Sequence, residues 1–102
     1  MSNADENLDR VLHAIADPTR RRILQSLKED VKGGSQPANT RGCLCAGDVE
    51  QRMKLSQSTI SHHMAILTKA GLVEAAKEGQ WRWYRRNEKA IRQVVKTLRG
   101  KL

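Results

Sequence analysis

Hydrophobic residues recur at helical spacing in five segments of the chain and alternate with polar residues in a sixth. The first segment has apolar positions at i, i+3, i+4 and i+7, which predicts a helix that ends near Ala16. Asp17 is suited to cap a second helix and Pro18 to begin it, and this helix should stop near Asp30. The two apolar stripes are Leu8, Val11, Leu12 and Ile15 in the first helix, and Ile23, Leu24 and Leu27 in the second.

Two more helices are expected after a polar segment. Residues 31–42 are rich in Gly, Ser, Pro, Asn and Thr and have almost nothing to bury, so we expect a flexible surface loop. Residues 46–54 have apolar positions at i and i+4, which predicts a short third helix. Ser56 can cap a fourth helix, and Gly71 can end it. The buried side of the fourth helix should consist of Ile60, His63, Met64 and Leu67.

The opposite side of the fourth helix has short polar side chains where a packing face would have apolar ones. These residues are Gln57, Ser58, Ser61, His62, Ala65 and Lys69. Short donors and acceptors pack poorly but can reach the edges of bases. Two helices joined by a short turn, the second polar in its N-terminal half, are typical of a helix-turn-helix, here over residues 46–70. The alternative is a solvated helix face without a binding role.

The alternating segment, residues 72–86, predicts a β-hairpin with its turn at Glu78 and Gly79. Such a hairpin next to a helix-turn-helix would be a wing. Its cations, which are suited to phosphate contacts, are Lys77, Arg82, Arg85 and Arg86. The alternative is a basic sheet edge that discourages aggregation.

Residues 88–99 predict a last helix with an apolar stripe of its own. That stripe is Ile91, Val94, Val95 and Leu98. A small protein would expose this stripe and that of the first helix unless a second subunit covered them. The predicted fold is mainly α with a small β-hairpin: a single domain over residues 1–102 with four helices, the hairpin and a fifth helix.

Composition favours an anionic partner. The 102 residues include 19 Lys and Arg and 11 Asp and Glu, a formal net charge of +8, and +7 of it lies from Lys77 onward. No apolar run approaches the roughly 18 residues of a membrane span, and the acidic N-terminus does not resemble a signal peptide. The two cysteines, one residue apart, suit a reducing cytosol. We therefore expect a cytoplasmic protein with no membrane partner.

Four motifs in order resemble the ArsR/SmtB family of winged helix-turn-helix bacterial repressors. They are DPTRRRIL (17–24), LCAGDV (44–49), LSQSTISHHMAILTKAGLV (55–73) and EGQWRWY (78–84). The first and third are most similar to the subgroup of small autorepressors typified by SdpR. The resemblance implies a homodimer, joined through the two terminal apolar stripes, on an inverted-repeat operator of double-stranded DNA. Each fourth helix would enter one of two successive major grooves and block polymerase, with the protein's own promoter as the expected target and the bacterial nucleoid as its location.

The resemblance also implies roles for single residues. The base-reading positions fall on Gln57, Ser58, Thr59, Ser61 and His62, and the wing contacts on the region from Lys77 to Arg82, with Arg85 as a further cation. His63 matches a position that supports the recognition helix. The family usually has apolar residues where Arg82 and Arg86 stand, so either the hairpin faces are exchanged or these arginines reach solvent by their stems.

Three interpretations of Cys43 and Cys45 stay open. Only Cys45 aligns with a thiol of the arsenic-sensing relatives, and a soft-metal site would need His13 or a group of the second subunit as a further ligand. A thiol switch would need only the two cysteines, with a pKa lowered by Arg41 nearby. The third interpretation is two small residues without a sensory role. The sequence therefore assigns no certain cofactor.

Other functions account for less of the sequence. An effector-independent DNA-binding protein or an RNA-binding protein would suit the charge, although three aromatic residues offer few stacking surfaces for RNA. The last helix could lie on an anionic membrane, but it lacks deep apolar anchors. A hydrolase built on Cys45 and His63 would lack an orienting group and an oxyanion motif, so we expect no enzyme.

Overall fold

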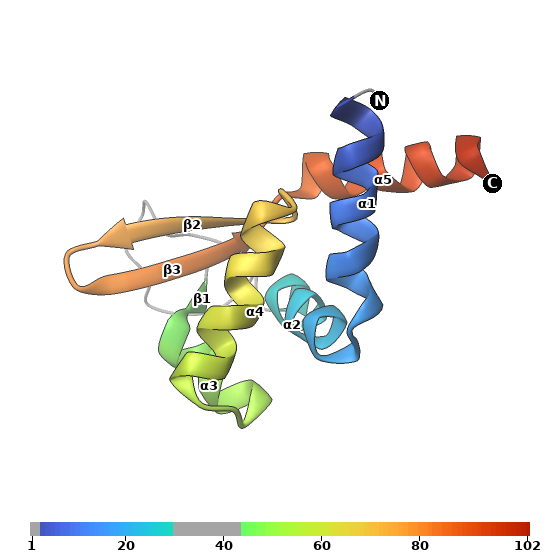
Figure 1. Cartoon of the computed structure of the whole chain (residues 1–102). Coiled ribbons are helices and arrows are strands. Elements are labelled where there is room, and N and C mark those ends of the chain that lie inside the picture. Colours follow the sequence, from blue (N-terminus) through green and yellow to red (C-terminus); the bar gives the residue numbers. More distant parts are fainter. Residues whose placement is uncertain (1–2, 30–43) are drawn as a thin grey trace.

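A computed structural model of the chain describes residues 3–29 and 44–102. The elements are α1 (Asn3–Ala16), α2 (Pro18–Glu29), β1 (Leu44–Cys45), α3 (Ala46–Met53), α4 (Gln57–Lys69), β2 (Val73–Glu78), β3 (Trp81–Arg86) and α5 (Glu88–Lys101). The mainly helical fold with a hairpin before the last helix is thus confirmed. In Figure 1 the β2–β3 hairpin extends to one side of the helices, while α5 crosses α1 and leads away on the other. The expected loop over 31–42, Arg41 and Cys43 lie outside the described residues.

Capping hydrogen bonds account for where α2 and α4 begin. The Oδ1 atom of Asp17 accepts from the backbone N–H groups of Thr19 at 2.7 Å and Arg20 at 3.1 Å. Ser56 Oγ accepts from the backbone N–H of Thr59 at 3.3 Å. Each cap satisfies donors that the first turn of a helix leaves without a partner. Because these side chains are local in sequence, α2 and α4 begin where the sequence predicted.

The sheet differs from the prediction in two respects. The short strand β1 pairs antiparallel with β3, so the sheet has three strands in the order β1-β3-β2. Two residues are too few to show the alternation that identifies a strand. The turn lies at Gly79 and Gln80, one residue later than expected, because Glu78 pairs with Trp81. Gly79 has a φ of +59°, which two-residue hairpin turns require at their first position.

The core lies among α1, α2, α3, α4 and the base of the sheet. Its largest fully buried side chains are Ile23, Ile60, Met64, Leu67, Val11, Val49 and Val73. The expected buried sides of α2 and α4 therefore face this core. Val11 is only 1% exposed because α1 packs against α2 and α4 within one subunit. Val11 therefore has almost no surface left for a second subunit to bury, and its place in the dimer interface stays a prediction.

The terminal helices leave apolar surface uncovered. Leu12 of α1 is 41% exposed and Val95 of α5 is 61% exposed, and α5 contributes no fully buried residue. The remaining stripe residues are half-buried: Leu8, Ile15, Ile91, Val94 and Leu98. None of the helices in the described parts of the chain is long and apolar enough to cross a lipid bilayer.

Candidate nucleic-acid interface

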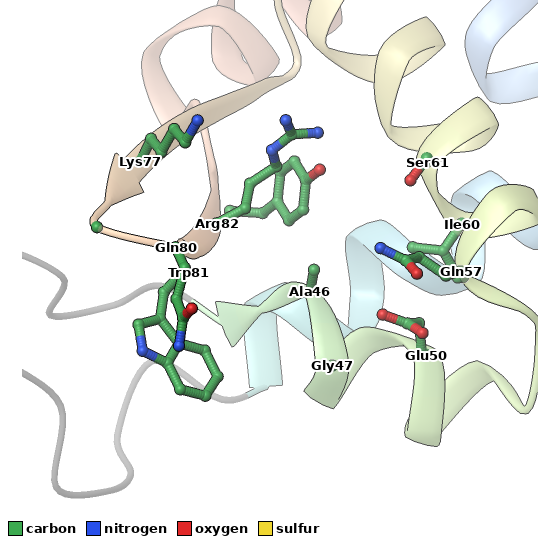
Figure 2. A pocket seen from close by; sticks show the side chains of 12 residues that line it. Ala46, Gly47, Glu50, Gln57, Ile60, Ser61, Lys77, Gln80, Trp81 and Arg82 are labelled. Atoms are coloured by element: carbon green, nitrogen blue, oxygen red, sulfur yellow. The ribbon is translucent and has the colours of Figure 1, made fainter.

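A groove of about 660 Å³ separates the first half of α4 from the hairpin. Gln57 and Ser61 lie on its α4 side, and Lys77 and Arg82 lie on its hairpin side (Figure 2). Hydrogen-bonding groups thus stand on one wall and cations on the other. This combination suits a ligand that carries both polar edges and negative charge.

The residues that helical periodicity places on the outer face of α4 are exposed in the structure. Gln57, Ser58, Ser61 and His62 are exposed, while the opposite side of the helix enters the core. Thr59 differs, because it is half-buried and its hydroxyl accepts from Ser56 Oγ at 2.9 Å. In this structure the Thr59 hydroxyl therefore stabilises the start of the helix.

The hairpin presents two cations side by side. Lys77 and Arg82 are direct cross-strand partners and both are exposed. Like charges opposite each other destabilise a strand pair, and a phosphate bound between them would remove that cost. Arg85 is three residues further along β3, so it lies on the other face of the sheet, where it forms a 2.9 Å ion pair with Glu74. Of the four expected wing cations, the groove is therefore lined by Lys77 and Arg82.

Arg86 faces neither the groove nor open solvent. Its Nη1 donates to the carbonyl oxygen of Leu24 at 3.2 Å, and its Nε lies 2.7 Å from Glu88 Oε1. The side chain thus joins the end of β3 to α2 and to the start of α5. The two arginines that depart from the family pattern have different surroundings: Arg82 lines the groove, and Arg86 holds elements together.

Three side chains that the sequence did not single out also line the groove: Glu50, Gln80 and Trp81. Glu50 of α3 lies below Gln57 in Figure 2, and a carboxylate can accept from the amino group of cytosine. Trp81, at the end of the hairpin, is 56% exposed. Their polar or aromatic character was the only sign of them in the sequence. Glu50 is far from the other two in the sequence, and the groove forms only where α3, α4 and the hairpin meet.

His63 lies on the half-buried side of α4, next to the nearly buried Arg20. Arg20 Nη1 is 3.2 Å from His63 Nδ1. A guanidinium can only donate, so Nδ1 accepts and the neutral ring has its proton on Nε2. This contact agrees with the supporting role expected of His63. Arg20 itself was missed, because three consecutive arginines give no sign of which one is buried.

The environment of Cys45 disfavours a reactive thiolate. The Cys45 Sγ donates to Asp48 Oδ2 at 3.2 Å. Burial raises the pKa of the Cys45 thiol, and the charge of Asp48 also acts in this direction. The expected lowering of the pKa is therefore wrong for Cys45. Across residues 3–29 and 44–102, no group of three or more His, Cys, Asp or Glu side chains could hold a metal ion.

Residues 15–75 match a family described as a helix-turn-helix domain. The chain is 35% identical over 93 residues to an uncharacterized HTH-type transcriptional regulator of Methanocaldococcus jannaschii, covering 91% of this chain and 92% of that protein. It is 33% identical over 88 residues to the transcriptional repressor SdpR of Bacillus subtilis, covering 86% and 84%. It is 30% identical over 93 residues to the arsenical resistance operon repressor of Staphylococcus aureus, covering 91% and 78%.

Solved structures share the fold. A crystal structure of an ArsR family transcriptional regulator superposes with a TM-score of 0.75 at 19% identity, covering 99% of this chain and 91% of that one. A solution structure of a homodimeric winged helix-turn-helix DNA-binding domain from Mycobacterium bovis gives a TM-score of 0.70 at 23% identity, covering 99% and 87%. The arrangement of helices and hairpin is therefore that of a winged helix-turn-helix.

Proposed function

The chain belongs to the ArsR/SmtB family of winged helix-turn-helix transcriptional repressors, and we propose that it represses transcription as a homodimer bound to an inverted-repeat operator. The family consists of DNA-binding regulators and not of enzymes. The groove between α4 and the hairpin is the observation that carries the proposal. Its α4 wall offers short side chains to base edges, and its hairpin wall offers cations to the phosphates alongside.

Two features support a dimer. Leu12 and Val95 expose apolar surface on the two terminal helices, and a structural neighbour with this fold is homodimeric. Two recognition helices related by a two-fold axis would contact half-sites about 34–36 Å apart, one turn of DNA. The dimer would block polymerase by occupying the site, with its own promoter as the first operator to test. We accordingly place it in the cytoplasm, on the nucleoid when bound.

The test is fluorescence anisotropy with a duplex from the protein's own promoter and a scrambled duplex at one salt concentration. A specific repressor should prefer its operator by at least about 10³-fold. Equal affinity for both duplexes, with steep salt dependence, would instead indicate a general polyanion-binding protein. An RNA duplex of the same sequence then tests the RNA-binding alternative.

Replacing Gln57 or Ser61 by alanine should lower the preference for operator over scrambled DNA by about 1–3 kcal/mol, if that side chain reads a base. The expected cause is an unpaired group on the base edge, which affects only the correct sequence. Gln51→Ala is a matched control, because Gln51 is exposed on α3 and does not line the groove. Equal losses on both duplexes would remove the base-reading role.

Replacing Lys77 or Arg82 by glutamine should weaken binding to both duplexes alike. Each substitution should also reduce the slope of log affinity against log salt concentration by about one unit. The expected cause is the loss of one phosphate contact and of the counterion it displaces. Affinities measured at several salt concentrations give the slope. Arg85→Gln is the control on the other sheet face; an equal change there would show that the groove is not the phosphate-binding surface.

A sensory role for the cysteines stays a prediction. The pKa of Cys45 is raised, which disfavours a thiolate nucleophile or metal ligand at neutral pH. The same anisotropy titration after mild oxidation decides between a thiol switch and two unreactive residues. Added soft metal ions in a parallel titration test the remaining interpretation.

A further inference from the structure

Arg20 is 7% exposed, and its guanidinium has partners on three elements. Its Nε donates to the carbonyl oxygen of Ala14 at 2.7 Å, and its Nη2 to that of His13 at 3.2 Å. Its Nη1 contacts His63 Nδ1 at 3.2 Å and lies 3.9 Å from Asp17 Oδ2. One side chain thus joins the end of α1, the start of α2 and the middle of α4.

This arrangement relates the position of α4 to that of α1. A nearly buried guanidinium is costly unless its donors find acceptors, so Arg20 favours the geometry in which all three contacts form. His63 is adjacent to His62 and two residues from Ser61, both on the exposed face of α4. Because a helix turn moves as a unit, displacing His63 would displace those side chains as well.

The contact requires a neutral imidazole. A proton taken from solvent at Nδ1 would remove the lone pair that accepts from Arg20 and place a second positive charge beside the guanidinium. The charged or titratable groups that face the ring are Arg20 of α2, Asp17 directly before α2, and His62 on α4, whose ring centroid is 5.7 Å away. From α1, the His13 side chain is exposed, and its backbone carbonyl accepts from Arg20.

We propose that Arg20 and His63 are positioning residues for the recognition helix, and that protonation of His63 breaks their contact and lowers DNA affinity. The proposal rests on the DNA-binding function proposed above. Burial is the largest cause that lowers the pKa of His63 below its ordinary value of 6.5; Arg20 and His62 lower it further, and Asp17 opposes them. The ring is therefore neutral at pH 7, and the contact should be lost as the pH falls through this lowered pKa. In unfolded chains the ring protonates nearer pH 6.5, so the free energy of unfolding should decrease over the same range.

The test measures operator affinity from pH 7.5 to pH 5 in a His62→Gln background. That substitution is needed because exposed His62 would gain attraction for phosphates when protonated, which would oppose the expected effect. Affinity should fall with a midpoint below pH 6.5, by at most about tenfold per pH unit for each subunit, which is the limit for one proton, and therefore by at most about a hundredfold for the dimer. A flat profile would overturn the proposal.

Two further variants distinguish positioning from simple structural support. His63→Asn keeps an acceptor close to the position of Nδ1 and cannot be protonated, so it should retain affinity at pH 7 and lose the pH dependence. A fall in affinity with the same pH profile would contradict this. If His63→Asn fails to fold, Arg20→Gln takes its place: it removes the adjacent positive charge and should move the midpoint to higher pH, and an unchanged midpoint would refute the proposal.

An NMR titration of the protein without DNA separates this proposal from the DNA-binding function. Imidazole nitrogen shifts at pH 7.5 should identify the form of His63 protonated on Nε2. On acidification, backbone amide signals of α4 and of residues 14–17 should change with the same midpoint as the ring. If no duplex binds, the proposed function fails, while these signals still show whether the contact responds to the proton. Titration of His63 without a response in α4 would overturn the positioning role even if DNA binds.

Discussion

Replacing Val95 by aspartate is expected to convert the proposed dimer into monomers and to lower operator affinity by about 10²–10⁴-fold. Val95 is 61% exposed on the apolar side of α5, where we expect the second subunit to cover it. A carboxylate in that contact would be buried without a partner, which opposes association. The effect on DNA is large because the second half-site is bound intramolecularly only while the two subunits are joined.

Analytical ultracentrifugation gives the oligomeric state of this variant, and anisotropy gives its operator affinity. Gly100→Asp is a matched control, since it adds the same charge to α5 at a position where a Cβ atom has no neighbour within 4 Å. A Val95→Asp protein that remains dimeric would place the interface elsewhere. A monomer with unchanged affinity would show that one subunit suffices for binding.

Replacing Leu67 by alanine should reduce the free energy of unfolding by about 2–5 kcal/mol. Leu67 is 0% exposed and belongs to the core on which α4 rests, so its truncation removes apolar contacts and leaves a cavity under the recognition helix. Urea unfolding at matched protein concentrations measures the loss. Thr68→Ala, at an exposed position on the same helix, should change stability by no more than about 0.5 kcal/mol.

The Leu67→Ala variant also separates folding from DNA contact. Its exposed α4 side chains are intact, so the variant should still bind operator. Operator at a concentration of 100 times the dissociation constant should raise its free energy of unfolding by about 2.7 kcal/mol, as it should for the unmodified protein. If Leu67→Ala lowers the free energy of unfolding by less than about 1 kcal/mol in the absence of DNA, Leu67 does not contribute to the core as we expect. Failure of operator to stabilise the folded variant would mean that the cavity alters the reading face.

The helix order could be predicted from the sequence because apolar residues recur at helical spacing in each helix and local side chains mark where α2 and α4 begin. Asp17 and Ser56 accept from donors within three residues, so their role is visible without the fold. The hairpin register could not be predicted in this way. A turn at Glu78 and Gly79 satisfies the same local preferences as one at Gly79 and Gln80, and the choice depends on which strand residues reach the core. Strand β1 depends in the same way on a distant partner, β3.

The exposed face of α4 could be predicted from periodicity, whereas contacts between distant elements could not. The pairing of Lys77 with Arg82 follows from the register. Arg20 differs from its two neighbouring arginines through burial next to the end of α1, and three consecutive arginines do not show in the sequence which one is buried. For Cys45, a neighbouring arginine suggested a lowered pKa, but Asp48, one helical turn away, is the group beside its sulfur.

Because α5 has no fully buried residue, the rate at which the protein is degraded should depend on its concentration. A helix of 14 residues is near the length at which isolated helices are only marginally stable in water. In one subunit, Ile91 and Val94 contact the core only in part, so in the proposed dimer α5 would gain much of its order from the second subunit. Dilution below the dimer dissociation constant would then fray α5 and expose it to proteases. A repressor of its own gene would in this way be cleared fastest when it is scarce, which sharpens the return of transcription.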